Sequence, residues 1–314
     1  MAIDNFLYFF YCLLYIILKR MIMKRREFII GISSLALALP FAARAGSRFP
    51  TMSNNSTFTK IIEKAVAKQW SDLPLSTVIG NVASELLGKS YKGGTLDIYS
   101  KEKCIINLDE LDCVTFFENS LALARLIKQE KYSYNALIEQ ITLLRYRKGI
   151  INDYTSRLHY TADWIYDNVR KGTIADISKQ IGGKTIKFNV SFMSKHPQYY
   201  KQLKNNPAFV KSIKSFETAI NKRIYYYIPK LQVSKIESKL QTGDIIAIVN
   251  TNKGLDYSHT GLIYRKAGKA HFMHASSIKK KVIIDKTISQ YLAHSKKSNK
   301  GISVLRPLEP ENAE

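Results

Sequence analysis

Two residues far apart in the sequence could form a nucleophile and its base. Cys113 follows Asp112 at the start of a predicted helix, where unpaired backbone N–H groups and the helix dipole favour a thiolate over a thiol. His259 stands at the head of a predicted strand, and a histidine within hydrogen-bond reach can accept the thiol proton. A third group must then orient the imidazole. The residue types therefore indicate nucleophilic catalysis by a cysteine.

Two histidines on the next predicted strand could supply that third group. Directly opposed residues of an antiparallel hairpin share a face, so a connecting loop of even length places His274 beside His259, whereas an odd loop offers His271. We favour His274 and expect His271 to point to the other side. The competing interpretation of Cys113 is an inert core residue, because cysteine is among the side chains most often buried.

Cysteines and histidines also raise the question of a metal. Cys104, Cys113, His259 and His274 carry zinc-ligating atoms, but no close Cys-x-x-Cys or His-x-x-x-His pair preorganises them. We therefore expect no metal and no other cofactor. A disulfide between Cys104 and Cys113 is a further possibility in an oxidising compartment, and it would remove the nucleophile.

The elements that must position these residues are helices followed by strands. Apolar residues at three- and four-residue steps predict helices, and short apolar runs bounded by turn residues predict strands. The predicted helices cover residues 58–70, 76–87, 113–129, 134–144 and 161–170, and the predicted strands cover 185–192, 224–228, 244–249, 260–265, 270–275, 282–284 and 302–305. Asp109 or Asp112 can cap the third helix. The pattern predicts an α+β fold with N-terminal helices packed on a C-terminal antiparallel sheet.

Composition and the N-terminus indicate a folded, exported chain. Of 314 residues, 46% are apolar and 23% charged, which excludes a disordered chain. Residues 23–45 have a basic start, a short apolar stretch and an Ala-x-Ala site, the order of a secretory signal that we expect to be cleaved after Ala45. Arg25 and Arg26 resemble a twin-arginine export signal, so we expect a bacterial, periplasmic protein. The apolar run 6–18 is too short to span a bilayer.

The net charge of the chain limits the classes of binding partner that we expect. The net charge is +23, and removing the predicted leader, which carries six basic and two acidic residues, leaves +19 on 269 residues. This favours anionic surroundings such as nucleic acid, membrane head groups or an acidic cell-wall polymer. Export argues against nucleic acid, and no basic run with interleaved aromatic residues forms a base-stacking groove. We expect a monomer with no nucleic-acid partner and no membrane span after cleavage of the signal.

The order of motifs resembles the NlpC-type family of bacterial cell-wall cysteine hydrolases, which are papain-like in fold. The family pattern is a tyrosine followed by paired glycines, an Asp-Cys at a helix start, a Gly-Asp strand, a His-x-Gly strand and a final His-Ala-Ser. This sequence matches the pattern at Tyr91 with Gly93-Gly94, Asp112-Cys113, Gly243-Asp244, His259-Thr260-Gly261 and His274-Ala275-Ser276.

One branch of that family is more similar still. The 146 residues from Cys113 to His259 exceed the interval in compact members. This long interval and the motif Arg157-Leu158-His159-Tyr160 resemble those of one branch of the family. That branch was first catalogued as a domain of unknown function and is known as an N-acetylmuramoyl-L-alanine amidase group. The resemblance implies a single enlarged catalytic domain, 58–314, behind a flexible entry segment, 46–57, with a large helical insertion at about 130–235.

The resemblance also implies roles for single residues. Cys113 attacks, His259 is the base, His274 orients it, and Tyr91 lies near the sulfur. The substrate-binding residues implied are Tyr91, Asp112, Arg157, His159 and Ser258.

The implied reaction is hydrolysis of the amide between N-acetylmuramic acid and L-alanine in peptidoglycan fragments. We expect a Cys113 thiolate paired with protonated His259 to attack the carbonyl, backbone N–H groups at the helix start to hold the oxyanion, and water to resolve the thioester. Two alternatives stay open. One is a D-glutamyl to diaminopimelate endopeptidase of the same fold, and the other is a catalytically inactive cell-wall binding module in which Cys104 and Cys113 are bridged.

Overall fold

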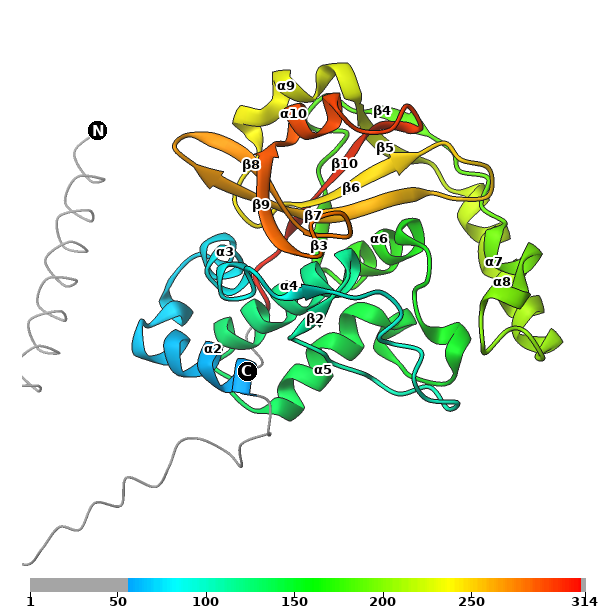
Figure 1. Ribbon diagram of the computed structural model, residues 1–314, viewed down its shortest axis with the longest axis horizontal. Coiled ribbons are helices and arrows are strands. Elements are labelled where there is room, and N and C mark those ends of the chain that lie inside the picture. The colour runs from blue at the N-terminus through cyan, green and yellow to red at the C-terminus, as the bar shows by residue number, and fades with distance from the viewer. Residues whose placement is uncertain (1–55, 312–314) are drawn as a thin grey trace, which may run out of the picture. The chain divides into compact units, whose positions relative to one another are not determined.

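Helices and strands form separate layers in residues 56–311, the part of the chain that the computed structural model describes (Figure 1). The predicted leader and residues 46–55 of the predicted entry segment lie outside the described residues. The first described helix begins at Ser56, two residues before the predicted helix. The α-helices are α2 Ser56–Ala67, α3 Leu75–Glu85, α4 Cys113–Lys128, α5 Tyr134–Arg145, α6 Thr161–Arg170, α7 Phe192–Lys195, α8 Pro207–Lys222, α9 Val233–Ile236 and α10 Ile288–Ala293.

The described strands join in one ten-stranded sheet with the order β2-β1-β9-β8-β7-β6-β10-β5-β4, and β3 pairs with β10 beside this path. The pairing of β1 with β2 is parallel and the other strand pairs are antiparallel. The strands are β1 Ser90–Tyr91, β2 Glu110–Leu111, β3 Ile174–Asp176, β4 Lys184–Ile186, β5 Tyr225–Pro229, β6 Ile245–Asn250, β7 Tyr257–Lys266, β8 Lys269–Ser276, β9 Lys281–Thr287 and β10 Asn299–Pro307.

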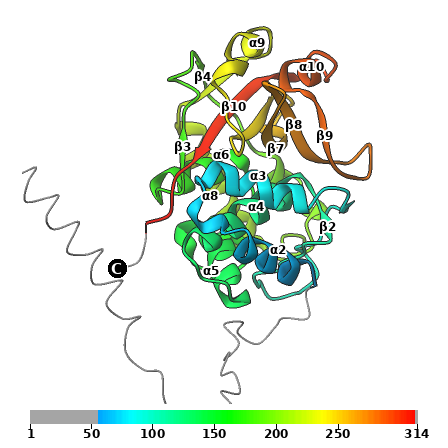
Figure 2. The same ribbon diagram turned by 90° about the vertical axis from the view of Figure 1, so that its left-hand side faces the viewer.

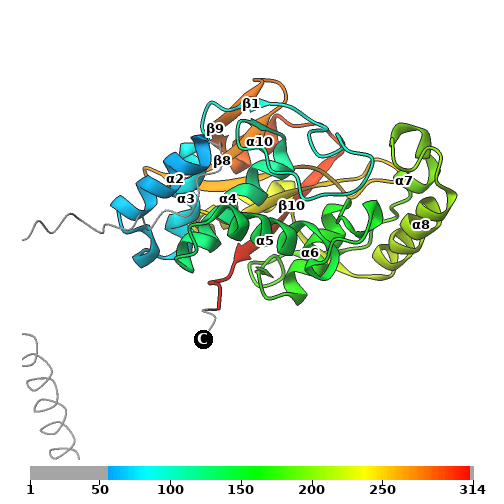
Figure 3. The same cartoon turned by 90° about the horizontal axis from the view of Figure 1, so that it is seen from below.

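Helices cover both faces of the sheet. Helices α3 to α6 lie on one face, and α9 and α10 lie on the other (Figures 1 and 2). Two buried apolar clusters match these layers: Leu262 and Met273 belong to the cluster with α2 to α6, whereas Phe272 belongs to the cluster with α9 and α10. Seen from below, α7 and α8 lie at the opposite end of the helical layer from α2 (Figure 3). The α+β class predicted from the sequence is confirmed.

The segment predicted as a helical insertion is only partly helical. Strands β3, β4 and β5 fall within residues 130–235 and extend the main sheet beyond β10. The predicted strand 185–192 is wrong after Ile186. Val190 lies four residues further on, and the Asn221 side chain on α8 accepts its N–H (2.7 Å) and donates to its carbonyl (3.0 Å), so this part of the segment is bonded to a helix.

The hairpin of β7 and β8 decides which histidines share a face. Its loop has two residues, Ala267 and Gly268, both with positive φ (48° and 76°), as a type I′ turn requires. Met273 lies opposite Leu262, so alternation along the strands places His259 and His274 on one face and His271 on the other. This is the arrangement that an even loop predicts.

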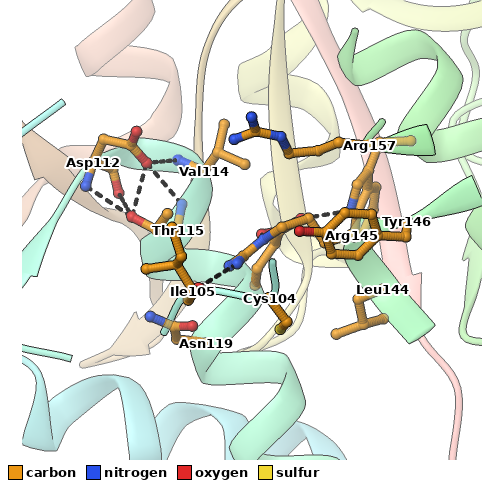
Figure 4. Close-up of polar contacts among 12 residues, drawn as sticks. Cys104, Ile105, Asp112, Val114, Thr115, Asn119, Leu144, Arg145, Tyr146 and Arg157 are labelled. Carbon is orange, nitrogen blue, oxygen red and sulfur yellow. Dashed lines mark hydrogen bonds and ion pairs between the residues drawn. The ribbon is translucent and has the colours of Figure 1, made fainter. Parts of the chain in front are cut away.

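A buried ion pair joins the helices beneath this hairpin. Arg145 on α5 donates from Nε to Glu118 Oε2 on α4 (2.8 Å), and Trp164 on α6 donates to Glu118 Oε1 (3.0 Å). Arg145 also donates to the Ile105 carbonyl (2.5 Å), as Figure 4 shows. Because a charge left unpaired in such a site is costly, these contacts fix the three helices relative to one another.

Two glycines of the sequence motifs have structural reasons. Gly243 has a φ of +86°, and the buried Asp244 beside it accepts two hydrogen bonds from Arg306 on β10 (2.9 and 2.8 Å). At Gly261 on β7, a Cβ atom would lie 2.6 Å from the Phe272 ring and 2.6 Å from the Met273 carbonyl oxygen. The Phe272 ring therefore occupies space that a side chain at residue 261 would need.

We expect Gly261→Ala to lower the free energy of unfolding by about 1–3 kcal/mol, because the added methyl overpacks a buried contact with backbone on one side. Urea denaturation measures the change. Gly93→Ala is the matched control, since no atom lies within 4 Å of a Cβ at that position. A Gly261→Ala protein as stable as the Gly93→Ala protein would contradict this account.

Candidate active site

Asp112 sets the position of Cys113 at the first turn of α4. Its carboxylate accepts the backbone N–H groups of Val114 (3.1 Å) and Thr115 (2.8 Å), and the Thr115 hydroxyl accepts the Asp112 N–H (2.9 Å; Figure 4). This reciprocal capping box stabilises the helix start. Of the two predicted caps, Asp112 is therefore the one used, whereas Asp109 pairs with Lys89 (2.5 Å).

Thr260 attaches the start of α4 to β7. Its hydroxyl donates to the Cys113 carbonyl (3.0 Å), and hydrogen bonds from its side chain and backbone partly oppose the rise in the pKa of the Cys113 thiol that burial causes. His259 directly precedes Thr260 on β7, so its backbone lies next to this contact with α4. Cys113 is half-buried. Within the described residues the sulfur has no direct hydrogen bond to His259. Such catalytic contacts are often long before substrate binds and shorten in the complex.

His259 and His274 form a hydrogen-bonded imidazole pair. His259 Nε2 lies 2.7 Å from His274 Nδ1, and the rings are nearly perpendicular (89°). Phe272 stacks on His274 with ring centroids 4.7 Å apart, and Tyr291 on α10 packs against the same imidazole at 5.2 Å. Because Nε2 of His259 is occupied, Nδ1 is the ring nitrogen left to act on the thiol.

Three residues at this site were given no role in the sequence predictions, although Thr260 stood in the His-x-Gly motif. Asp285 on β9 has its Oδ2 atom 3.5 Å from His274 Nε2, and Thr260 and Tyr291 contact the site as described above. Asp285 follows the predicted strand 282–284 by one residue, so only its strand could have been proposed. Its pairing with β8 depends on an irregularity in register between His271 and Met273, which no sequence pattern indicated.

Burial favours the neutral forms of the Cys113 thiol and the His259 imidazole. Burial, and next the Asp112 carboxylate, raise the pKa of the Cys113 thiol to about 11. Burial, and next the neighbouring His274, lower the pKa of His259 to about 3. These directions favour a neutral thiol and a neutral imidazole in the free protein, whereas the sequence analysis expects a thiolate paired with protonated His259. The helix dipole favours a thiolate, but the capping carboxylate sits at the same helix end and opposes it.

Tyr91 and Ser258 lie close to these groups. Burial, and next the charge of Cys113, raise the pKa of Tyr91, so its hydroxyl stays protonated. Ser258 donates to Asn299 Oδ1 (2.8 Å). Ser258, both histidines and Asp285 line a cleft of about 500 Å³, together with Asn250, Asn252, Lys286, Gln290, Tyr291, His294, Lys296 and Asn299 among others.

Arg157 and His159 lie in a separate buried cluster. Arg157 forms ion pairs with Asp97 (2.5 Å) and Glu102 (3.2 Å). His159 Nε2 contacts the Tyr154 carbonyl (2.8 Å), and burial, followed by Arg157, lowers the pKa of His159 to about 3. Neither residue lines the 500 Å³ cleft, so their contact with substrate stays a prediction.

Cys104 and Cys113 are both free thiols, in contrast to the bridged arrangement considered above. Cys104 instead contacts the Ile138 carbonyl (3.8 Å). Among the described residues, no group of three or more His, Cys, Asp or Glu side chains is arranged to hold a metal ion. No helix in this part of the chain is long and apolar enough to cross a membrane.

Known proteins are similar to this chain in sequence and in fold. A family model described as N-acetylmuramoyl-L-alanine amidase-like matches residues 81–302. The crystal structure of an N-acetylmuramoyl-L-alanine amidase from Bacteroides uniformis is 36% identical, covers 74% of this chain and 99% of its own, and superposes with a TM-score of 0.69. None of the curated proteins compared with this chain matches it.

Two further solved structures are similar. A putative xylanase from Bacteroides fragilis is 38% identical, covers 71% of this chain and 98% of its own, and has a TM-score of 0.66. A Legionella pneumophila protein of the DUF1460 family is 22% identical over 81% of this chain and 95% of its own, with a TM-score of 0.60, and shows the fold alone.

We expect Asp112→Asn to lower the pKa of the Cys113 thiol, because it removes the carboxylate charge while asparagine keeps the helix cap. The pH dependence of alkylation by iodoacetamide, measured in a Cys104→Ala background, reports that pKa. Asp109→Asn removes a charge four residues before the thiol and should leave the midpoint unchanged. An unchanged or higher midpoint in Asp112→Asn would refute the role given to this carboxylate.

Proposed function

We propose that this chain, which belongs to the family of N-acetylmuramoyl-L-alanine amidase-like proteins, hydrolyses the amide between N-acetylmuramic acid and L-alanine in peptidoglycan fragments with Cys113 as its nucleophile. One observation supports the chemistry: Thr260, which donates to the Cys113 carbonyl at the start of α4, directly follows His259, whose ring is 2.7 Å from His274. The helix start against an antiparallel strand also supports an NlpC-type, papain-like arrangement, in one enlarged catalytic domain over residues 58–314.

The attack begins from a neutral thiol. His259 Nδ1 takes the proton as the Cys113 sulfur adds to the carbonyl carbon, and the carbonyl oxygen becomes an oxyanion. The N–H groups of Val114 and Thr115 are already bonded to Asp112, so the expected oxyanion site is reduced to the Cys113 N–H. We propose that the protonated Tyr91 hydroxyl is its second donor.

The proton taken from the thiol is used in the next step of the reaction. Protonated His259 gives its proton to the departing amine of L-alanine, which leaves a thioester between Cys113 and the lactyl carbonyl. Neutral His259 next takes a proton from water, whose oxygen attacks the thioester, and then returns that proton to the departing sulfur, which releases the sugar acid and restores the free thiol. The mature charge of +19 suits fragments that carry carboxylates, and we place the enzyme as a monomer in the periplasm.

The alternatives differ in what they require. A glycoside hydrolase, as the name of the Bacteroides fragilis protein suggests, uses two carboxyl groups across the scissile bond, but Asp285 is the one carboxyl-bearing residue that lines the described cleft. A silent binding module with bridged cysteines conflicts with two free thiols. A D-glutamyl to diaminopimelate endopeptidase would use the same chemistry, and its products distinguish it from the amidase.

Mass spectrometry of muropeptides digested by the mature protein separates the two bonds. Release of an intact stem peptide that begins at L-alanine is the expected result, and L-Ala-D-Glu retained on the sugar would instead establish the endopeptidase. Cys113→Ala should lose at least about 1000-fold in kcat, because it removes the nucleophile. Cys104→Ala is the matched control and should keep the wild-type rate.

The neutral pair also predicts the pH profile. Protonated His259 cannot accept the thiol proton, so kcat/KM should fall only as pH drops toward the lowered pKa of about 3. On the alkaline side the thiol stays protonated until pH nears about 11. We expect kcat/KM to be level between about pH 5 and pH 9. A bell-shaped profile of kcat/KM, with both half-maximal points between about pH 5 and pH 9, would instead indicate that a thiolate–imidazolium pair is the active form.

A further inference from the structure

The imidazole pair ends at a carboxylate. Asp285 Oδ2 lies 3.5 Å from His274 Nε2, and Oδ1 of the same residue accepts the Lys286 N–H (2.7 Å). The Asp285 side chain is 28% exposed and opens onto the cleft that the histidines line. Three groups thus follow one another in contact: the Asp285 carboxylate, His274 and His259.

Proton positions along this row are coupled. A neutral imidazole donates from one nitrogen and accepts at the other. For His259 to accept the thiol proton at Nδ1, its own proton must be on Nε2, from which it donates to His274 Nδ1. His274 must then carry its proton on Nε2 and needs an acceptor there. Within the described residues, Asp285 Oδ2 is the acceptor recorded at that nitrogen.

The reverse arrangement would disable the base. If His274 carried its proton on Nδ1, it would donate to His259 Nε2 and leave the His259 proton on Nδ1, the nitrogen available to the thiol. Phe272 and Tyr291 pack against the His274 ring, so the ring is held in place and the remaining freedom is the position of its proton. A carboxylate at Nε2 decides that position.

We propose that Asp285 is a positioning residue that fixes the tautomers of His274 and, through it, of His259, so that Nδ1 of His259 is free to take the thiol proton. This inference rests on the proposed cysteine hydrolase function. The carboxylate also favours the positive charge that His259 acquires during attack. The titratable groups around Asp285 are His274, whose Nε2 faces its carboxylate, and His271, whose Nδ1 contacts its backbone carbonyl from the other face. Lys286, Tyr291, His294 and Lys296 line the same cleft.

Variants Asp285→Ala and Asp285→Asn test the proposal in two measurements. Steady-state kinetics on muropeptides should show kcat reduced about 10- to 100-fold in Asp285→Ala with KM changed less than about twofold. Asp285→Asn should lie between, because its amide oxygen can still accept the His274 N–H but carries no charge. Glu63→Gln, which removes an exposed charge on α2, is the control and should match the wild type.

Nitrogen-15 NMR of histidine-labelled protein reads the tautomers without any substrate. In the wild type both His259 and His274 should carry the proton on Nε2, and in Asp285→Ala the His274 proton should shift in part to Nδ1. If the wild type cleaves no muropeptide, the proposed function fails while the NMR result still decides the positioning role. Unchanged tautomers in both variants, or wild-type kcat in Asp285→Ala, would overturn the proposal.

Discussion

The contact between Thr260 and the first turn of α4 is the constraint on which the site depends. The nucleophile and its base are 146 residues apart in the sequence, and the hydrogen bond from Thr260 to the Cys113 carbonyl joins their elements directly. The space left by Gly261 admits the Phe272 ring, which stacks on His274. A helix start, a strand and the partner strand are therefore fixed to one another within a few residues.

Asp112 has two opposing effects at this helix start. Its carboxylate bonds two backbone N–H groups and so lets α4 begin at Cys113. The same negative charge, added to burial, opposes ionisation of the thiol. The proposed enzyme therefore resembles a serine hydrolase in the order of proton transfer. The nucleophile is neutral at rest, and the base removes its proton only during attack. The pair of His259 and His274, with the Asp285 carboxylate next to His274, suits this removal of the thiol proton during attack.

Local patterns predicted much of the fold, and tertiary contacts explain the remainder. The apolar stripe after Asp112 predicted α4, and the loop at Ala267 and Gly268 decided which histidine joins His259. The position of Asp285 depends on an irregular pairing of β8 with β9, and the Val190 backbone is bonded to Asn221, 31 residues further along the chain. The thiol pKa depends on burial, which the sequence order of Cys113 and Asp112 does not contain.

The central claim is that His259 is the base for the Cys113 thiol. The rate at which a thiol-reactive probe labels Cys113 near pH 7 tests it most directly, in a Cys104→Ala background and without substrate. His271→Ala removes an imidazole from the opposite face of the same hairpin and should leave the rate unchanged. We predict that His259→Ala slows labelling at least about tenfold, because a neutral thiol reacts slowly without a base. Labelling of His259→Ala at the wild-type rate would contradict the account.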